Sequence, residues 1–158
     1  MIDGWTTEAL PLPQPELGLV VQYRFVWAGA GRGSPPDVGK SRPCLIVDLE
    51  QVGEPSLGGR LVTRVTYLPI SHVAPRAAEQ AIPVPPRVGR HIGLSHETSY
   101  VYTSYAVEDD WPFDLDTVPG TDGVFDYGLI PPKLFASVAE DFANYLAMHP
   151  RFVHQRSG

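Results

Sequence analysis

An arginine and a serine at the two ends of one predicted β-hairpin are the residues best suited to chemistry in this chain. Arg42 precedes the apolar run Cys44–Val47, and Ser71 follows Leu68-Pro69-Ile70. A guanidinium group can bind two oxygens of a phosphate, and a nearby hydroxyl can add a hydrogen bond. His72 is a candidate proton carrier beside them. Such a set could stabilise the negative charge that develops on a phosphate group during a reaction.

The hairpin that would position these groups is predicted from the residue pattern. The run Cys44–Val47 is typical of a strand that is covered on both faces. Glycine and proline mark a connection over Val52–Gly59, and valine, threonine and tyrosine return over Leu61–Leu68. Pairing of the two strands would bring Arg42 and Ser71 to the same end of the hairpin.

The rest of the chain predicts short strands and one long helix. Leu19–Trp27 alternates apolar and polar residues, and Thr98–Val107 is rich in tyrosine and valine, so both are expected to be strands, the second one pairing near the hairpin. A short extended piece is expected around residues 82–84, and one or two helical turns over Arg87–Leu94. Apolar residues then recur at helical spacing between Pro131 and Pro150, which predicts a C-terminal amphipathic helix.

Composition and charge limit the classes of protein that fit. The chain has 158 residues, of which 43% are hydrophobic, and its 17 prolines and 15 glycines favour a β-rich fold with many turns. We expect one domain over residues 17–150, an extended N-terminal arm over 1–16 and a tail over 151–158. The net charge of −6 requires any anionic partner to be held by a local basic patch.

Cysteine usage and hydropathy indicate the compartment. The single cysteine, Cys44, cannot form an intramolecular disulfide and is expected to be a small buried hydrophobe. No apolar run approaches the length of a membrane span, and the N-terminal residues lack the pattern of a signal peptide. A cytoplasmic protein without a membrane partner is therefore expected.

The order of motifs from Gly18 to His72 resembles the MazF/PemK toxin family. Asp37–Val47 (DVGKSRPCLIV) is similar to the family's acidic loop residue followed by an Arg-Pro pair that opens an apolar strand, and Leu68–Ser71 is similar to the end of its next strand. The resemblance implies a mainly β, SH3-like barrel of the MazF/PemK/CcdB type, here with the C-terminal amphipathic helix. It also implies a homodimer that cleaves single-stranded RNA without a metal or cofactor and binds a small antitoxin protein.

The resemblance also assigns roles to individual residues. Arg42 corresponds to the family's catalytic arginine, Ser71 to its catalytic threonine and Asp37 to its loop glutamate. Serine keeps the hydroxyl group and aspartate keeps the charge on a shorter stem. The expected catalytic residues are Arg42, Ser71 and His72, and the expected RNA-binding residues are Asp37, Lys40 and Tyr67.

Other interpretations of these residues stay open. Taken singly, an arginine before a proline often pairs with an acidic neighbour, and a serine at a strand exit often caps a turn. The negative net charge, the change from threonine to serine and the segments that have no counterpart in the family favour a catalytically silent binding or regulatory module of the same fold. A metal-dependent nuclease could use the carboxylates of the acidic segment Glu108–Asp126, namely Asp109, Asp110, Asp114 and Asp116, although a solvated acidic loop is commoner.

Side chains elsewhere carry weaker alternatives. Tyr100, Tyr102 and Tyr105 could stack on bases, although such tyrosines more often pack in a core. For His72, His91 and His96, surface or core roles are commoner than catalysis, and the spacing of His91 and His96 is not a zinc pattern.

Overall fold

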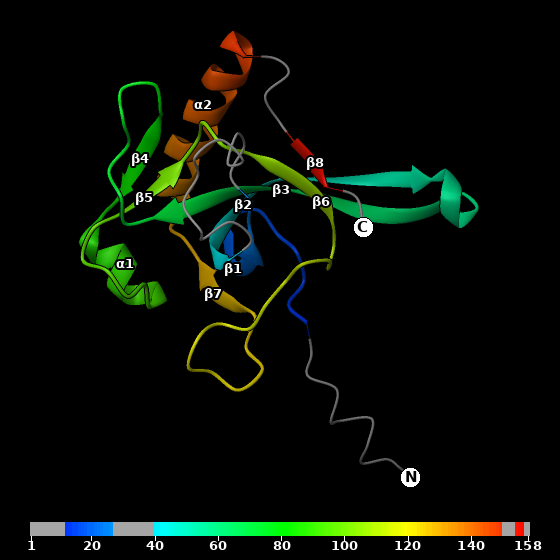
Figure 1. The fold of residues 1–158 in the computed structure, drawn as a ribbon, viewed down its shortest axis with the longest axis horizontal. Coiled ribbons are helices and arrows are strands. Elements are labelled where there is room, and N and C mark those ends of the chain that lie inside the picture. Colours follow the sequence, from blue (N-terminus) through cyan, green and yellow to red (C-terminus); the bar gives the residue numbers. More distant parts are fainter. Residues whose placement is uncertain (1–11, 27–39, 150–153, 157–158) are drawn as a thin grey trace.

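The computed structural model describes residues 12–26, 40–149 and 154–156 (Figure 1), the last three by their backbone only. In chain order, its strands and helices are β1 (Leu19–Arg24), β2 (Ser41–Glu54), β3 (Arg60–Ser71), β4 (Ala81–Val84), α1 (Pro86–Ile92), β5 (Ser99–Tyr102), β6 (Val107–Asp110), β7 (Asp126–Leu129), α2 (Pro132–Met148) and β8 (His154–Arg156).

The strands form one sheet in the order β4-β5-β3-β2-β1-β7. Neighbours along this path are antiparallel, β6 pairs antiparallel with β3, and β8 pairs parallel with β6. The expected mainly β fold is therefore confirmed. Among the described strands no pairing joins β4 to β7, so the sheet remains open and the closed SH3-like barrel is not seen in these pairings.

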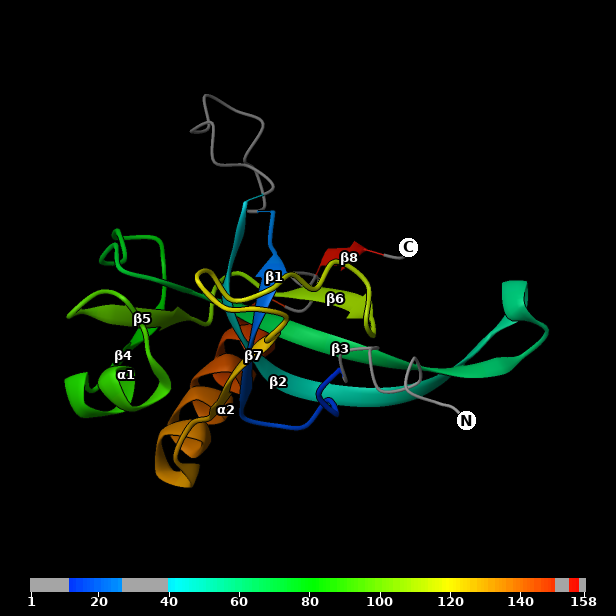
Figure 2. The same ribbon diagram turned by 90° about the horizontal axis from the view of Figure 1, so that it is seen from below.

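The predicted hairpin is present and is longer than the sequence pattern indicated. Strands β2 and β3 pair from Cys44 and Pro69 to Glu54 and Arg60, and a 3₁₀ turn at Pro55–Leu57 connects them. Gly58 and Gly59, with φ of 68° and 82°, complete the turn in a conformation that favours glycine. Figure 2 shows the far end of this hairpin projecting well beyond the body of the molecule.

The central strands bury side chains on both faces, as the run Cys44–Val47 predicted. Leu45 and Val47 belong to a core cluster that also contains side chains of α2. Cys44 and Ile46 point the opposite way, into a second cluster with Tyr23 and Tyr67. Burial on both faces requires a continuous apolar run, because successive side chains of a strand alternate between the faces.

Helix α2 confirms the predicted C-terminal amphipathic helix. Pro132 occupies its first turn, where a missing N–H is tolerated, and Val138 and Phe142 are buried in the core cluster. The helix contacts β2 and β4. The short strand β4 and the helix α1 also lie where they were expected. Neither helix in the described part of the chain combines the length and apolarity that crossing a bilayer requires.

Three segments differ from the sequence-based expectation. The predicted strand Thr98–Val107 is interrupted, and its two ends lie in β5 and β6, which both pair with β3. The acidic segment is partly strand, because it supplies the rest of β6 as well as the start of β7. Residues 154–156 of the predicted tail pair with β6 as β8.

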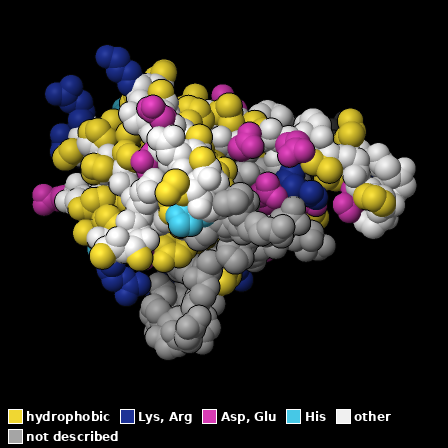
Figure 3. Space-filling model, turned by 90° about the horizontal axis from the view of Figure 1, so that it is seen from above, with side chains coloured by type: hydrophobic (Ala, Val, Ile, Leu, Met, Phe, Trp, Pro, Cys, Tyr) yellow, Lys and Arg dark blue, Asp and Glu magenta, His cyan; other side chains and the backbone are white. Residues whose placement is uncertain are grey.

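Charged side chains gather where β6 meets the hairpin. Figure 3 shows acidic side chains around a basic one at the base of the projecting hairpin. Arg64 donates a hydrogen bond to Asp110 at 2.9 Å, and Glu108 and Glu54 lie near enough to add to the field on Arg64. The Asp110 hydrogen bond raises the pKa of Arg64 above its usual value.

Candidate functional site

A pocket lies where β2 and β3 part from each other. Cys44 and Pro69 are the last partners of the two strands, after which β2 pairs only with β1, and the end of β3 pairs with β5. The gap between the parting strands opens a cavity of about 500 Å³. We call it the Arg42 pocket, and its polar lining includes Gln22, Lys40, Arg42, Ser71, His72, His96 and Tyr127.

The charge of this pocket is opposite to that of the protein. The chain carries 18 acidic residues and a net charge of −6, yet none of the described residues that line the pocket is a carboxylate. Lys40 and Arg42 supply two positive charges, and His72 and His96 can each accept a proton. A cavity lined in this way attracts anions.

Arg42 and Ser71 line the same cavity from two different strands. Arg42 is half-buried near the start of β2, and Ser71 is half-buried at the end of β3. The Ser71 hydroxyl oxygen accepts a hydrogen bond of 3.2 Å from the Val73 N–H, which leaves its proton to donate. The pocket can therefore offer a guanidinium and a hydroxyl donor to one anionic group.

A hydrogen-bonded glutamine links three strands at the pocket lining. The Tyr127 hydroxyl donates to the side-chain oxygen of Gln22 at 2.5 Å, and the Gln22 amide donates to the Ser41 hydroxyl at 3.0 Å. Burial raises the pKa of Tyr127 to about 12, so the hydroxyl remains protonated and keeps donating. This chain of bonds joins β7, β1 and β2 directly beside Arg42.

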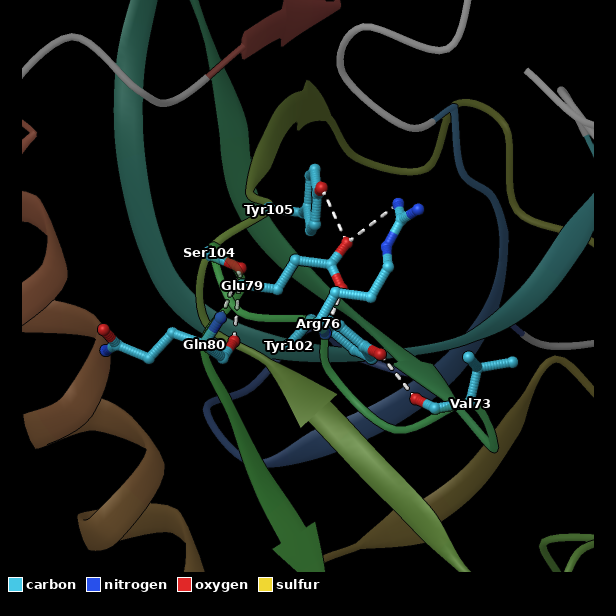
Figure 4. Close-up of polar contacts among 7 residues, drawn as sticks. All are labelled: Val73, Arg76, Glu79, Gln80, Tyr102, Ser104 and Tyr105. Atoms are coloured by element: carbon cyan, nitrogen blue, oxygen red, sulfur yellow. Dashed lines mark hydrogen bonds and ion pairs between the residues drawn. The ribbon is translucent and has the colours of Figure 1, made fainter. Parts of the chain in front are cut away.

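The segment after β3 is held in place by the side chains drawn in Figure 4. The Tyr102 hydroxyl donates to the carbonyl of Val73, the residue that follows His72. Glu79 accepts hydrogen bonds from the Arg76 N–H at 2.8 Å and from the Tyr105 hydroxyl at 2.9 Å (Figure 4). Although burial alone would raise the pKa of Glu79, these bonds lower it below its usual value. The network anchors the loop that carries His72.

His96 reaches the pocket from a different part of the chain. Gly93 ends α1 in a left-handed conformation, with φ of 80°, and its N–H bonds to the carbonyl of Arg90. The chain then turns back along the pocket, where the His96 ring stacks on that of His72. The ring centroids are 4.0 Å apart and the planes differ by 18°.

The structure brings most of the predicted site residues together. Lys40, Arg42, Ser71 and His72 all line the Arg42 pocket. Asp37 lies outside the described residues. Tyr67 does not line the pocket, because its ring is fully buried in the core and stacks on Tyr23 with centroids 4.1 Å apart. The expectation that Tyr67 binds RNA is therefore corrected to a role in packing.

Three lining residues were not singled out for this site by the sequence. Gln22 was noted only as a polar residue of the first strand, Tyr127 lies in a strand that was not predicted, and His96 was weighed as a surface residue. No local motif marks them, since the pairing of distant segments brings them to the pocket.

The acidic segment does not form the arrangement that a metal nuclease needs. Asp109 and Asp110 are buried, and they are engaged by Tyr23 at 2.8 Å and by Arg64 at 2.9 Å, respectively. Within the described ranges, no three side chains of histidine, cysteine, aspartate or glutamate are grouped so that they could hold a metal ion. The base-stacking alternative is also not favoured for Tyr102, which is buried and hydrogen-bonded.

Comparisons of the chain with models of protein families, with curated proteins and with solved structures find no match.

Proposed function

We propose that the protein is a metal-independent endoribonuclease that binds single-stranded RNA at the Arg42 pocket and resembles the MazF/PemK toxins. The observation that carries the proposal is the convergence of Arg42, Ser71 and His72 on one cavity with no carboxylate among its described lining residues. A volume of about 500 Å³ lies within the range of ligand pockets, about 300–1,000 Å³.

The residues suit the charge changes of RNA cleavage. Attack of a 2′-hydroxyl forms a bond from O2′ to phosphorus and breaks the bond to O5′, which leaves a 2′,3′-cyclic phosphate and a free 5′-hydroxyl. The non-bridging oxygens gain negative charge on the way. Arg42 can bind two of these oxygens and Ser71 can donate to one, so both bind the transition state more strongly than the ground state.

Lys40 and His72 complete the proposed site. Lys40 is exposed at the pocket and can hold a neighbouring phosphate as a point charge. His72 is exposed at the pocket and can transfer a proton, which Arg42 cannot do because a guanidinium stays protonated in proteins. The resemblance also implies that Asp37 acts as the family's loop glutamate does, and this role is part of the same proposal.

The wider properties implied by the resemblance belong to the same proposal. They are an SH3-like barrel built on the central strands, a homodimer, a cytoplasmic location and a small antitoxin that covers the pocket. The antiparallel pairing of β1, β2 and β3 is of the kind that such a barrel uses. An antitoxin segment with acidic side chains would complement the positive lining of the pocket.

The experiment is cleavage of single-stranded RNA by the purified protein in the presence of EDTA, with the products analysed for 2′,3′-cyclic phosphate ends. Arg42→Ala should abolish cleavage. Arg60→Ala is the matched control, because Arg60 is exposed at the far end of the projecting hairpin. Loss of activity with EDTA, or equal activity of the two variants, would refute the proposal.

A binding or regulatory module is the second candidate, and the net charge of −6 favours it. Such a module would hold RNA at the pocket without breaking it. The same assay separates the two functions: RNA that is bound by the wild type, is released by Arg42→Ala and stays intact would establish the module.

A further inference from the structure

The stacked pair His72 and His96 is the feature of the Arg42 pocket that the proposed function leaves unexplained. His72 follows β3, whereas His96 follows α1, so separate elements bring them together. Their ring centroids are 4.0 Å apart, and both side chains are exposed at the pocket. Burial of the two rings therefore does not account for the stack, and both rings are open to a ligand in the pocket.

We infer that His72 and His96 are the two proton-transfer groups of RNA cleavage, which makes His96 a further catalytic residue. The inference rests on the proposed function. It deepens that function, because it says how the attacking oxygen loses a proton while the leaving oxygen gains one.

The spacing of the two rings fits an in-line displacement at phosphorus. In such a reaction the attacking and leaving oxygens lie on opposite sides of the phosphorus, so each oxygen needs its own proton-transfer group. The rings of His72 and His96 are separated by 4.0 Å and are nearly parallel, at 18°. Two imidazoles that lie side by side at the pocket supply one ring for each of the two oxygens.

The charge of the pair also suits one base and one acid. Two positively charged rings at 4.0 Å would repel each other, and Lys40 and Arg42 line the same pocket. The proposed step uses one neutral and one protonated imidazole, and a histidine side chain can take either form. An anionic phosphate placed against Arg42 would offset part of the positive charge of the protonated ring.

Other described lining groups are poorly suited to accept the 2′-hydroxyl proton. None is a carboxylate, and Arg42 has no acceptor atom. The Tyr127 hydroxyl is committed to Gln22 at 2.5 Å. The serine hydroxyls are weak bases, and the proposed site uses Lys40 to hold a neighbouring phosphate, so the two histidines are assigned as the proton carriers.

The two imidazoles together account for both protons that move in the reaction. The neutral imidazole takes the proton of the 2′-hydroxyl as the bond from O2′ to phosphorus forms. The protonated imidazole gives its proton to O5′ as the bond from phosphorus to O5′ breaks. Each turnover exchanges the states of the two rings, and proton exchange with water restores them.

The first experiment compares His72→Asn and His96→Asn with His91→Asn as the matched control. His91 is exposed on α1 and is not among the lining residues of the pocket. Loss of general acid or base catalysis lowers rates by about 10²–10⁴-fold. We expect such a loss in kcat for both pocket variants and a change below about threefold for His91→Asn, with unchanged melting temperatures. His96→Phe keeps an aromatic ring for stacking and should be as inactive as His96→Asn.

The second experiment uses RNA whose 5′ leaving oxygen is replaced by sulfur, which departs without a proton. One of the two asparagine variants should regain most of its activity on this substrate, and the other should not. The inference is overturned if His96→Asn or His96→Phe cleaves like the wild type, or if both or neither of the asparagine variants is rescued. Absence of cleavage by the wild type would instead refute the proposed function itself.

Discussion

The carboxyl group of Asp109 is buried beside two stacked tyrosines. Its burial predicts a measurable dependence of stability on pH. Its exposed fraction is 1%, and its oxygens accept hydrogen bonds of 2.8 Å from the Tyr23 hydroxyl and the Asp110 N–H. Burial raises the pKa of Asp109 from 3.8 to about 6, and Asp114 adds to the rise, while the two hydrogen bonds oppose it. The folded protein therefore holds this proton more tightly than the unfolded chain does.

The sign and size of the effect follow from linkage. Below a pH of about 4, Asp109 is protonated in both states, and the full stability is present. As the pH rises through 6, the folded state must bury a charge, and stability is lost. The difference between 3.8 and about 6 corresponds to about 3 kcal/mol in the free energy of unfolding. For a domain of this size it corresponds to a melting temperature lower by roughly 6–12 °C.

Asp109→Asn removes the charge and keeps the shape of the side chain. Thermal and denaturant unfolding from pH 4 to pH 8 should show that the variant gains stability over the wild type as the pH rises, by about 3 kcal/mol across the range. Asp122→Asn is the control, because Asp122 is exposed. A stability difference between Asp109→Asn and the wild type that does not change with pH would refute this account.

Four further substitutions test other parts of the structure. Tyr67→Phe should leave stability unchanged or raise it by about 1 kcal/mol in denaturant unfolding, since its buried hydroxyl has no hydrogen-bond partner among the described residues. Tyr23→Phe should lower the free energy of unfolding by about 1–3 kcal/mol, because Asp109 loses a hydrogen-bond donor. If Tyr67→Phe proved less stable than Tyr23→Phe, the described hydrogen bonding would be contradicted. Lys40→Ala should make the binding of single-stranded RNA less dependent on salt. The slope of log affinity against log salt concentration should become shallower by about 0.7. An unchanged slope would show that Lys40 does not contact an RNA phosphate. Tyr102→Phe should lower kcat several-fold with melting largely retained, because the loop after β3 loses an anchor; unchanged kcat would show that the anchor does not position the site.

The sequence was sufficient to predict the parts of the fold that depend on local pattern. The run Cys44–Val47 predicted burial on both faces, because alternate side chains of one strand meet two separate core clusters. The hairpin pattern predicted that Arg42 and Ser71 lie at the same end. Antiparallel pairing of two strands joined by a short turn places the start of the first strand beside the end of the second.

The parts that depend on distant contacts were not predictable in this way. The strand β6 has an acidic sequence that is typical of a loop, yet Tyr23 and Arg64 engage Asp109 and Asp110 and allow them to be buried. His96 joins the pocket only because α1 and β5 fold back beside β3, and no local spacing marks it. The predicted strand is likewise interrupted because β5 and β6 pair with different parts of β3, at residues 70–71 and 64–67 respectively.

The most direct test of the proposed site is a crystal structure with single-stranded RNA in which fluorine replaces every 2′-hydroxyl, so that the nucleophile is absent and cleavage is blocked. The account predicts a backbone phosphate inside the Arg42 pocket, with the Arg42 guanidinium and the Ser71 hydroxyl within hydrogen-bonding distance of its oxygens. His72 and His96 should lie side by side next to the same phosphate, one ring near the 2′ position and the other near O5′. RNA bound on another face of the molecule, or a phosphate that contacts neither Arg42 nor Ser71, would contradict it.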